Sequence, residues 1–407
     1  MRPKPTYYEF FAGGGMARAG LGDGWDCLFA NDFDAKKAAS YRANWGGEEL
    51  FVGDVRAIET KDLPGRADLV WASFPCQDLS LAGGGAGLAG ERSGTFWPFW
   101  EIVKELRKEE RAPPLLVLEN VCGALTSHGG KDFVAICAAL AKQGYRFGAL
   151  VIDAALFLPQ SRPRLFIVAT REDVSVPPTL CLGSRHCERS EAIQEPPHDS
   201  GSLRCARDDS EGAIFHTRAL RAAYERLPRR LRERWLWWRL PAPPLRYTTL
   251  VDLIEDAPKD VPWHSREETA ALIAMMSEVN LAKLSEAKRA GRKMVGTLYR
   301  RTRYQAGEKI QRAEARFDDL AGCLRTPAGG SSRQFVLVVD KGRVRSRLIS
   351  ARETARLMGL PDAYVLPDNY NDAYHLTGDG VAVPVVRHLA AHVLEPLLGF
   401  RALRVAA

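Results

Sequence analysis

The feature that most constrains the fold is an alternation of short apolar runs with helical patterns over the first 170 residues. The apolar runs predict strands near residues 6–11, 26–31, 50–53, 67–74, 114–119, 147–153 and 164–170. Helical patterns lie between them, near residues 16–22, 34–44, 95–110 and 131–143, with Asp34 as the expected cap of the second. Such alternation is typical of a parallel sheet covered by helices. The sequence therefore predicts a doubly wound α/β fold.

The texture changes after Arg171 to Pro, Ser and Arg in short irregular pieces, which indicates a domain boundary. Two segments near the end, 349–360 and 384–398, again have helical patterns, and the second is apolar enough to dock on the first sheet. We therefore expect one domain from residues 1–170 plus 371–407 and a second, smaller irregular domain from residues 171–370.

Residues 181–212 have few large hydrophobic side chains and no periodicity, so burial cannot offset the entropy of ordering them. They resemble peptides encoded by mobile palindromic repeats inserted into bacterial genes, and we expect a disordered surface insertion. Zinc was considered because Cys181, His186, Cys187, His198 and Cys205 lie here. No CxxC or HxxxH pair provides a chelating spacing, and no metal is expected.

Positive charge is concentrated in two places. From Thr217 to Arg246 there are nine arginines and two glutamates, which gives this segment a charge of +7, and a second basic stretch runs from Lys288 to Arg316. A solvated helix face is the simpler interpretation, and an anionic polymer is favoured only if other residues indicate nucleic-acid chemistry. With no apolar run of bilayer length, no signal peptide and no disulfide pattern, we expect a cytoplasmic protein.

Three segments predict a nucleoside cofactor. Gly13, Gly14 and Gly15 lie between a predicted strand and a helix, where glycine lets a ligand approach the backbone and the helix offers free amides. Asp32 ends the second strand, where a carboxylate can accept hydrogen bonds from ribose hydroxyls, and Asp54 closes the third strand, near an adenine amino group. These features alone do not separate a methyltransferase from a dehydrogenase.

Cys76 follows Pro75 at the carboxyl end of a strand, the edge at which open α/β sheets place reactive groups. A free cysteine is most often a small buried hydrophobic residue. The glycine-rich loop Leu81–Gly94 that follows favours a nucleophile beneath a mobile flap instead.

Glu119 ends a buried apolar strand, where a carboxylate is costly unless it has a partner or a chemical role. Desolvation should raise its pKa, so that it can donate a proton to a ring nitrogen; a structural salt bridge is the alternative. Arg162 and Arg164 precede another strand, where one guanidinium could hold a carbonyl oxygen and the other a phosphate or carboxylate.

Short segments of the chain resemble, in order and approximate spacing, the motifs of the DNA cytosine-5 methyltransferase family. They are FAGGG (11–15), SFPCQDLS (73–80), LENV (118–121), QSRPR (160–164), SRLISARETARLMGLPD (346–362) and TGDGVAVPVV (377–386). The resemblance covers residues 7–170 and about 345–398, and proline-cysteine-glutamine followed by the glutamate and QxRxR is highly specific.

The resemblance implies a mostly parallel seven-stranded catalytic domain, S-adenosylmethionine as cofactor and S-adenosylhomocysteine as product. Phe11, Ala12, Gly13 and Gly15 would border the cofactor's methionine end. Asp32 would meet its ribose, and Asp54 with Val55 its adenine. Pro75 would back the site, and Ala382 with Val383 would close it. Two positions depart from the family pattern. Glu9 replaces an aspartate and remains a carboxylate, whereas Val381 replaces an asparagine and removes a side-chain hydrogen bond to the cofactor.

The implied reaction adds the Cys76 thiolate to a flipped-out cytosine. Glu119 would bond to ring nitrogen 3, and Arg164, or else Arg162, would hold the carbonyl at position 2. The implied partner is double-stranded DNA, bound by a monomer within a restriction-modification system that includes a restriction endonuclease encoded nearby.

Residues 171–345 hold both basic stretches, a tryptophan cluster and Thr326-Pro327, which resembles a short conserved piece of the family's smaller domain. We expect target recognition there, and weaker DNA binding when Arg229, Arg230 and Arg232 are neutralised. The alternatives are a transfer-RNA cytosine methyltransferase, which the large basic region disfavours, and a DNA-binding homologue with impaired catalysis, which the intact Cys76, Glu119 and Arg164 disfavour.

Overall fold

The computed structural model describes residues 3–75, 93–182, 213–305, 308–326 and 333–399. The predicted nucleophile Cys76, residues 81–92 of the expected flap, residues 183–212 of the expected insertion and Pro327 lie outside the described residues. No helix in these described ranges is long and apolar enough to cross a membrane.

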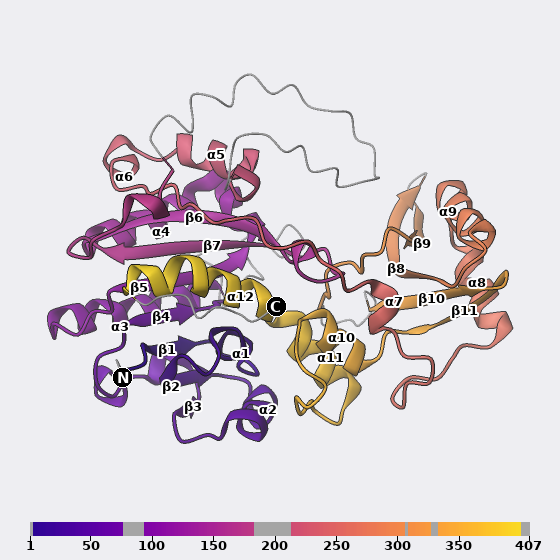
Figure 1. The fold of residues 1–407 in the computed structure, drawn as a ribbon, viewed down its shortest axis with the longest axis horizontal. Coiled ribbons are helices and arrows are strands. Elements are labelled where there is room, and N and C mark those ends of the chain that lie inside the picture. The colour runs from indigo at the N-terminus through magenta and orange to yellow at the C-terminus, as the bar shows by residue number, and fades with distance from the viewer. Residues whose placement is uncertain (1–2, 76–92, 183–212, 306–307, 327–332, 400–407) are drawn as a thin grey trace.

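A seven-stranded sheet forms the larger part of the molecule, with strand order β3-β2-β1-β4-β5-β7-β6 (Figure 1). Strand β7 is antiparallel to both of its neighbours, and the other adjacent strands run parallel. The strands are β1 (Thr6–Phe10), β2 (Asp26–Asp32), β3 (Leu50–Val52), β4 (Leu69–Ala72), β5 (Leu115–Val121), β6 (Tyr145–Asp153) and β7 (Pro163–Arg171). The seven predicted strands and the doubly wound α/β class are confirmed.

Both faces of this sheet are buried, because alternate residues of the central strands enter different hydrophobic clusters. Leu115 and Val117 of β5 belong to one cluster, and Leu116 and Leu118 to the other. The covering helices in the first half of the chain are α1 (Met16–Leu21), α2 (Ala35–Trp45), α3 (Phe96–Lys108) and α4 (Lys131–Lys142). Asp34 caps α2 as predicted, because its carboxylate accepts hydrogen bonds from the amides of the first turn.

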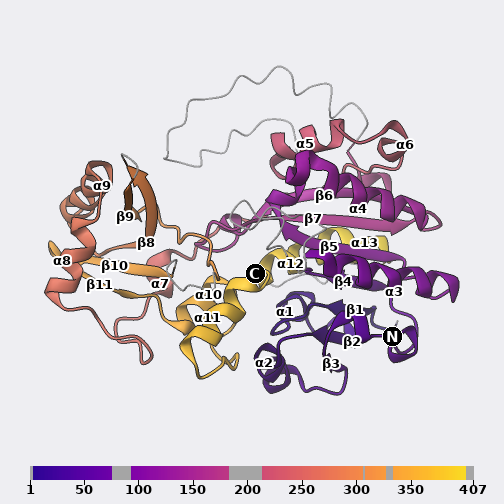
Figure 2. The ribbon, with the colours of Figure 1, turned by 180° about the vertical axis from the view of Figure 1, so that it is seen from behind.

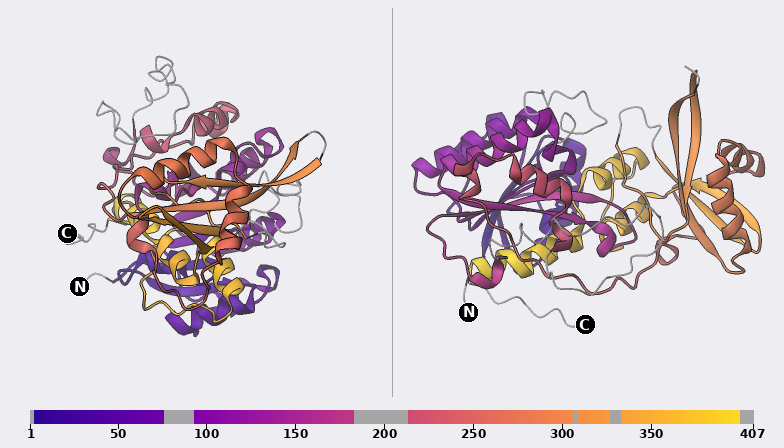
Figure 3. Two further views of the ribbon diagram at one scale, coloured as in Figure 1. Left: turned by 90° about the vertical axis from the view of Figure 1, so that its right-hand side faces the viewer. Right: turned by 90° about the horizontal axis from the view of Figure 1, so that it is seen from above.

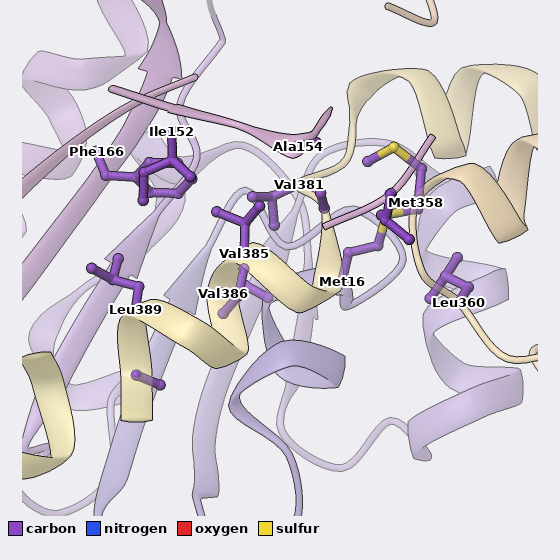
Figure 4. Packing of buried hydrophobic residues seen from close by; sticks show 14 of the residues in the cluster. Met16, Ile152, Ala154, Phe166, Met358, Leu360, Val381, Val385, Val386 and Leu389 are labelled. Carbon is purple, nitrogen blue, oxygen red and sulfur yellow. The ribbon is translucent and has the colours of Figure 1, made fainter. Parts of the chain in front are cut away.

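The last helical segment packs beside α1. It consists of α12 (Val383–Leu389), a π-helical turn (Ala390–Leu394) and α13 (Glu395–Leu397). Figure 4 shows Val385, Val386 and Leu389 of this segment in the same apolar cluster as Met16 and Phe166. The expectation that this segment docks on the first sheet is therefore confirmed.

A second sheet of four antiparallel strands lies at the other end of the molecule (Figure 2). Its order is β11-β10-β8-β9, from β8 (Met294–Gln305), β9 (Glu308–Arg316), β10 (Gln334–Asp340) and β11 (Arg343–Leu348). The helices near it are α7 (Leu250–Leu253), α8 (Arg266–Ala274) and α9 (Glu278–Arg289). The sequence analysis expected an irregular second domain and did not predict these strands.

The arginine-rich segment that begins at Thr217 packs on the first sheet and not on the second. It forms α5 (Arg218–Glu225) and α6 (Arg229–Arg232), followed by a strand-like bridge between Trp235 and Phe147 of β6. The Trp238 indole is fully buried and donates a hydrogen bond to the Val168 carbonyl at 3.1 Å. The tryptophans that the sequence analysis grouped with target recognition are therefore core residues of the first sheet.

The connection between the two sheets contains two further helices. Helices α10 (Ala351–Leu357) and α11 (Tyr370–Asp379) contact each other, and the Tyr364 hydroxyl between them donates to the Gly14 carbonyl at 2.6 Å. The segment that contains α10 therefore reaches the glycine turn of the first sheet. Figure 3 shows α10 and α11 between the two sheets.

Candidate active site

The turn after β1 has an unusual backbone. Phe11, Gly13 and Gly15 have φ of 59°, 58° and 77°, and a positive φ is costly for a non-glycine residue such as Phe11. Apart from its two chain neighbours, no atom of the described residues lies within 4 Å of the position that a Gly13 side chain would occupy, which leaves open space beside the backbone. The turn therefore combines an exposed edge of main chain with the start of helix α1, the geometry that suits a close-bound polar ligand.

Asp32, at the end of β2, holds this turn. One carboxylate oxygen accepts from the Gly13 amide at 2.7 Å, and the other accepts from the Asp34 amide at 2.8 Å. Asp32 is 8% exposed. Burial raises its pKa, although Lys37 and the two amides oppose this effect. The carboxylate thus fixes the glycine turn against the end of β2.

Asp54 and Val55 follow β3 on the same side of the sheet. The Asp54 carboxylate accepts from the amide and from the guanidinium of Arg56, each at 2.9 Å, and the amide hydrogen bond lowers the pKa of Asp54. Val55 is buried. Phe33, which the sequence analysis did not single out, lies next to Asp32 with 76% of its surface exposed. The exposure of this aromatic ring beside a buried acid is visible only in the fold, so the sequence offered no signal for Phe33.

These residues fit a nucleoside cofactor such as S-adenosylmethionine. The open glycine turn follows β1, and the Asp32 carboxylate and the exposed Phe33 ring lie at the end of the adjacent strand β2. Asp54 follows β3, which neighbours β2. Ala12, whose amide donates to the Asn31 carbonyl at 2.8 Å, is buried. This set of donors, acceptors and apolar surface suits a ligand that carries ribose hydroxyls and an adenine ring.

The final motif contributes apolar surface near the same turn. Val381 and Ala382 are buried, and the Val383 amide donates to the Met358 carbonyl at 2.9 Å. Val381 belongs to the hydrophobic cluster that contains Met16 of helix α1 (Figure 4). The valine that replaces the family's asparagine therefore occupies an apolar environment.

Pro75 is the last described residue before Cys76. The segment that leads to it is held by Asn120, whose side-chain amide donates to the Phe74 carbonyl at 3.1 Å. Asn120 is buried at the end of β5, next to Glu119 in the chain. One asparagine therefore links the segment before Cys76 to the strand that carries Glu119.

Glu119 is 6% exposed, and its carboxylate lies 3.4 Å from Nε of Arg164. Burial raises the pKa of Glu119, while the guanidiniums of Arg164 and Arg162 and the Ser73 hydroxyl act in the opposite direction. Ser73 also accepts from the Trp71 indole at 3.0 Å, so its own proton is available to the carboxylate. Ser73 is a second residue that the sequence analysis missed.

The two predicted arginines lie in different environments. Arg164 pairs with Val121 across β5 and β7 and faces Glu119. Arg162 is only 1% exposed, and its Nη2 donates to the carbonyls of Gly378 and Gly380 at 2.7 and 2.6 Å. Because these carbonyls occupy its guanidinium, Arg162 joins β7 to the final motif, whereas Arg164 is the arginine that meets the buried acid.

Among the described residues, no three His, Cys, Asp or Glu side chains are arranged to hold a metal ion. Of the five residues considered for zinc, only Cys181 is described, and it is partly buried beside Trp238.

The molecule has a seven-stranded sheet with one antiparallel strand, an open glycine turn after β1, an acid at the end of β2 and another after β3. This is the class I methyltransferase fold. The family model described as C-5 cytosine-specific DNA methylase matches residues 6–395. The chain therefore belongs to this family and is a DNA cytosine-5 methyltransferase.

Similar proteins that are named as methyltransferases support this assignment. The Type II methyltransferase M.HpaII of Haemophilus parainfluenzae is 25% identical over 98% of this chain and 91% of its own length. Type II methyltransferase M.BsuFI of Bacillus subtilis is 36% identical, but the match spans 42% of this chain and 41% of that relative. The Entamoeba histolytica methyltransferase EhMeth shares the fold, with a TM-score of 0.58 at 12% identity over 98% of this chain and 99% of its own.

Proposed function

We propose that the chain methylates carbon 5 of a cytosine rotated out of duplex DNA, with Cys76 as the nucleophile. The observation that carries this proposal is a shared sheet edge. Pro75, which is bonded directly to Cys76, follows β4, and the adjacent strand β5 carries Glu119 paired with Arg164. The glycine turn follows β1, the neighbour of β4 on its other side. The segment that leads to Cys76, the acid and the glycine turn thus follow three consecutive strands at one edge of the sheet.

Cys76 makes carbon 5 reactive. Its thiolate forms a bond with carbon 6 of the cytosine ring, and the electron pair displaced from the double bond accumulates at carbon 5. After methylation, the proton on carbon 5 passes to a base, the double bond re-forms and the carbon–sulfur bond breaks. A stacked duplex hides both faces of the ring, so the base must rotate out at a cost of a few kcal/mol.

Glu119 provides the proton that this addition requires. Its burial favours the neutral carboxyl, which donates to ring nitrogen 3 as negative charge develops on the ring. Arg164, on the same edge, holds the carbonyl oxygen at position 2 and limits the rise of the Glu119 pKa. Arg162 contributes its positive charge near Glu119, while its Nη2 is held by the backbone of the final motif.

S-adenosylmethionine, when bound, supplies an electrophilic methyl group from its sulfonium. The residues that would hold its methionine end are Phe11, Ala12, Gly13 and Gly15, with Pro75, Ala382 and Val383 closing the pocket. Asp32 would accept from the ribose hydroxyls through the lone pairs that Gly13 and Asp34 leave available. Asp54 and Val55 would meet the adenine, and the exposed Phe33 ring would cover one of its faces.

The DNA-binding face that we propose is the ribbon formed by β8 and β9. These strands pair from Thr297 to Gln305, whereas β10 pairs with β8 only as far as Tyr299, so the outer half of the ribbon extends beyond the sheet (Figure 3). A two-stranded ribbon has the width that a DNA major groove accepts.

The charge on this ribbon supports the assignment. Arg301 lies directly opposite Arg312, and Arg301 and Arg303 both form ion pairs with Glu314, so this part of the ribbon has more cations than anions. A hollow of about 530 Å³ beside them is lined by five basic side chains and one acidic side chain, which gives it a charge of +4; these are Lys283, Arg301, Arg303, Arg312, Arg316 and Glu314. Phosphates and guanine edges are the groups on DNA that arginines bind.

The Type II names of the relatives lead us to propose that the chain is the modification enzyme of a restriction-modification system. It would act in the cytoplasm as a monomer and protect sites that a separately encoded endonuclease cleaves. The transfer-RNA alternative is disfavoured because the matching family is described as a DNA methylase.

Bisulfite sequencing of DNA from cells that express the chain tests this function. The proposal predicts protected cytosines within one short sequence, and none with Cys76→Ser, a variant that still binds DNA. Transfer of a tritiated methyl group to DNA and to transfer RNA in parallel separates the two substrates. Label in transfer RNA alone, or undiminished activity of Cys76→Ser, would contradict the proposal.

A further inference from the structure

Cys323 lies between the two arginines of the candidate site. Its sulfur is 3.4 Å from Nη1 of Arg162 and 3.8 Å from Nη2 of Arg164. The thiol also donates to the Leu324 carbonyl, with sulfur and oxygen 3.7 Å apart. A thiol can accept from both guanidiniums while it donates its own proton, so these three contacts are compatible with one another.

The segment that carries this thiol is fixed to both sheets. The Ala321 amide donates to the Pro159 carbonyl, and the Ser161 amide donates to the Ala321 carbonyl, each at 2.8 Å. The Gly322 amide donates to the Gln334 side chain at 2.9 Å, which ties the segment to the first residue of β10. Cys323 therefore has a rigid backbone, and its sulfur has little freedom to move away from the arginines.

The contact to Arg164 has more consequence than the contact to Arg162. Arg162 is already held by two backbone carbonyls at its Nη2. The Arg164 guanidinium, by contrast, faces Glu119 through Nε at 3.4 Å and presents Nη2 to the sulfur. The third nitrogen, Nη1, donates to the neighbouring Pro163 carbonyl at 3.0 Å. The sulfur, the carboxylate and this carbonyl thus contact different nitrogens of one planar group, and each contributes to its orientation.

We infer that Cys323 is a positioning residue that orients Arg164 toward Glu119 and the cytosine carbonyl. This inference rests on the proposed function, since it assigns Arg164 to the reacting base. Burial raises the pKa of the Cys323 thiol, but Arg162 and Arg164 outweigh that effect and leave its pKa below the ordinary value, as expected for sulfur in contact with two cations.

Two substitutions test the inference through steady-state kinetics. Cys323→Ala should lower kcat by on the order of 10- to 100-fold, with KM for DNA and for S-adenosylmethionine changed less than about twofold, because a misdirected guanidinium costs orientation and not binding. Cys323→Ser keeps a donor and acceptor at this position and should restore most of the activity. Cys181→Ala removes another partly buried thiol, in a residue whose backbone pairs with Trp238, and should leave kcat unchanged.

The pH profile separates positioning from a general loss of stability. Arg164 opposes the rise of the Glu119 pKa, so a released Arg164 should shift the alkaline limb of kcat/KM to higher pH in Cys323→Ala and not in Cys181→Ala. The inference would be overturned if the pH profile of kcat/KM were unchanged in Cys323→Ala. It would also be overturned if Cys323→Ser lost as much kcat as Cys323→Ala.

Alkylation of Cys323 provides a readout that needs no activity. In Cys76→Ser protein, the rate of modification by iodoacetamide should have a pH midpoint below that of an ordinary thiol, and this midpoint should rise when Arg164→Gln is added. A midpoint that Arg164→Gln leaves unchanged contradicts the inference. Absence of methyl transfer by the wild-type chain would refute the proposed function, while this experiment would still decide whether the thiol contacts Arg164.

Discussion

Burial raises the pKa of Glu119 and two nearby guanidiniums lower it, and the effect of burial is the larger. The raised pKa means that the proton needed by ring nitrogen 3 is retained to a higher pH than an exposed glutamate would retain it. Methyl transfer should therefore be lost as the pH rises through the pKa of Glu119. Glu119→Gln should lower kcat by on the order of 10²- to 10⁴-fold and abolish this alkaline limb.

The measurement is methyl transfer as a function of pH. The control is Glu101→Gln, which changes an exposed glutamate on α3 that pairs with Lys104. Equal alkaline limbs in the wild type and in Glu119→Gln would show that another group donates the proton.

Glu9 presents a second buried carboxyl, in β1 before the glycine turn. Burial raises its pKa to about 8, with Arg18 acting in the opposite direction. One of its oxygens has no hydrogen-bond partner among the described residues. The folded protein therefore holds a proton that the unfolded chain releases above about pH 4.5, so stability is lost as the pH rises from that value to about 8.

Over this interval the free energy of unfolding should fall by on the order of 1 kcal/mol per pH unit, as measured by urea unfolding at several pH values. Glu9→Gln should flatten the dependence, whereas Glu59→Gln, at an exposed position, should not. A slope that survives Glu9→Gln would assign the proton to a different group.

At the scale of elements, the junction of β11 and α10 depends on a fully buried ion pair. Arg347 and Glu353 have no exposed side-chain surface and are joined by two hydrogen bonds of 2.8 and 2.6 Å. Arg347 also donates to the Glu255 carbonyl at 2.7 Å, and Ser350 caps α10 with Glu353 as the reciprocal partner. This pair therefore connects the second sheet to the helix that leads back to the glycine turn.

Glu353→Ala should lower the free energy of unfolding by about 3–5 kcal/mol, because it leaves a buried guanidinium without its counterion. Replacing both partners, by Arg347→Met with Glu353→Leu, should recover part of the loss. Asp318→Ala breaks the exposed pair with Arg316 and should cost less than about 1 kcal/mol. Similar losses of unfolding free energy in Glu353→Ala and Asp318→Ala would contradict this view of the junction.

The sequence predicted the first sheet well because its strands are buried on both faces and therefore appear as continuous apolar runs. The second sheet escaped prediction because β8 and β9 carry arginines such as Arg301 and Arg312 on the face away from their core, which weakens any apolar pattern. Cys76 and Glu119 could be singled out from their motifs. Phe33, Ser73 and Cys323 could not, because their significance lies in neighbours that only the fold brings together.

Over the whole molecule, the two basic stretches that were both expected to take part in target recognition lie on different sheets. Helix α6 lies beside the start of β6, where Trp235 bridges Phe147, whereas Arg164 pairs with Ile152 near the other end of that strand. Five residues of extended chain separate the two points by about 17 Å. Arg229, Arg230 and Arg232 therefore lie away from the edge that holds Glu119.

The triple variant with alanine at Arg301, Arg303 and Arg312 should bind DNA more weakly and show a salt dependence reduced by up to about three units of slope, because each phosphate contact contributes about one unit. The matched variant with alanine at Arg229, Arg230 and Arg232 removes the same charge and should change binding little. Fluorescence anisotropy at several salt concentrations measures both. A larger loss of DNA affinity in the variant of Arg229, Arg230 and Arg232 would instead place the DNA-binding face at α6.

The proposed reaction requires a covalent bond between Cys76 and carbon 6 of a cytosine. The most direct test uses duplex DNA with 5-fluorocytosine at the methylated position, because fluorine at carbon 5 cannot leave as a proton and the enzyme cannot be released. With S-adenosylmethionine present, the wild-type chain should form a complex that survives denaturation, and mass spectrometry should find the nucleotide on the peptide that contains Cys76. A complex that forms equally with Cys76→Ser, or a nucleotide on any other residue, would contradict the account.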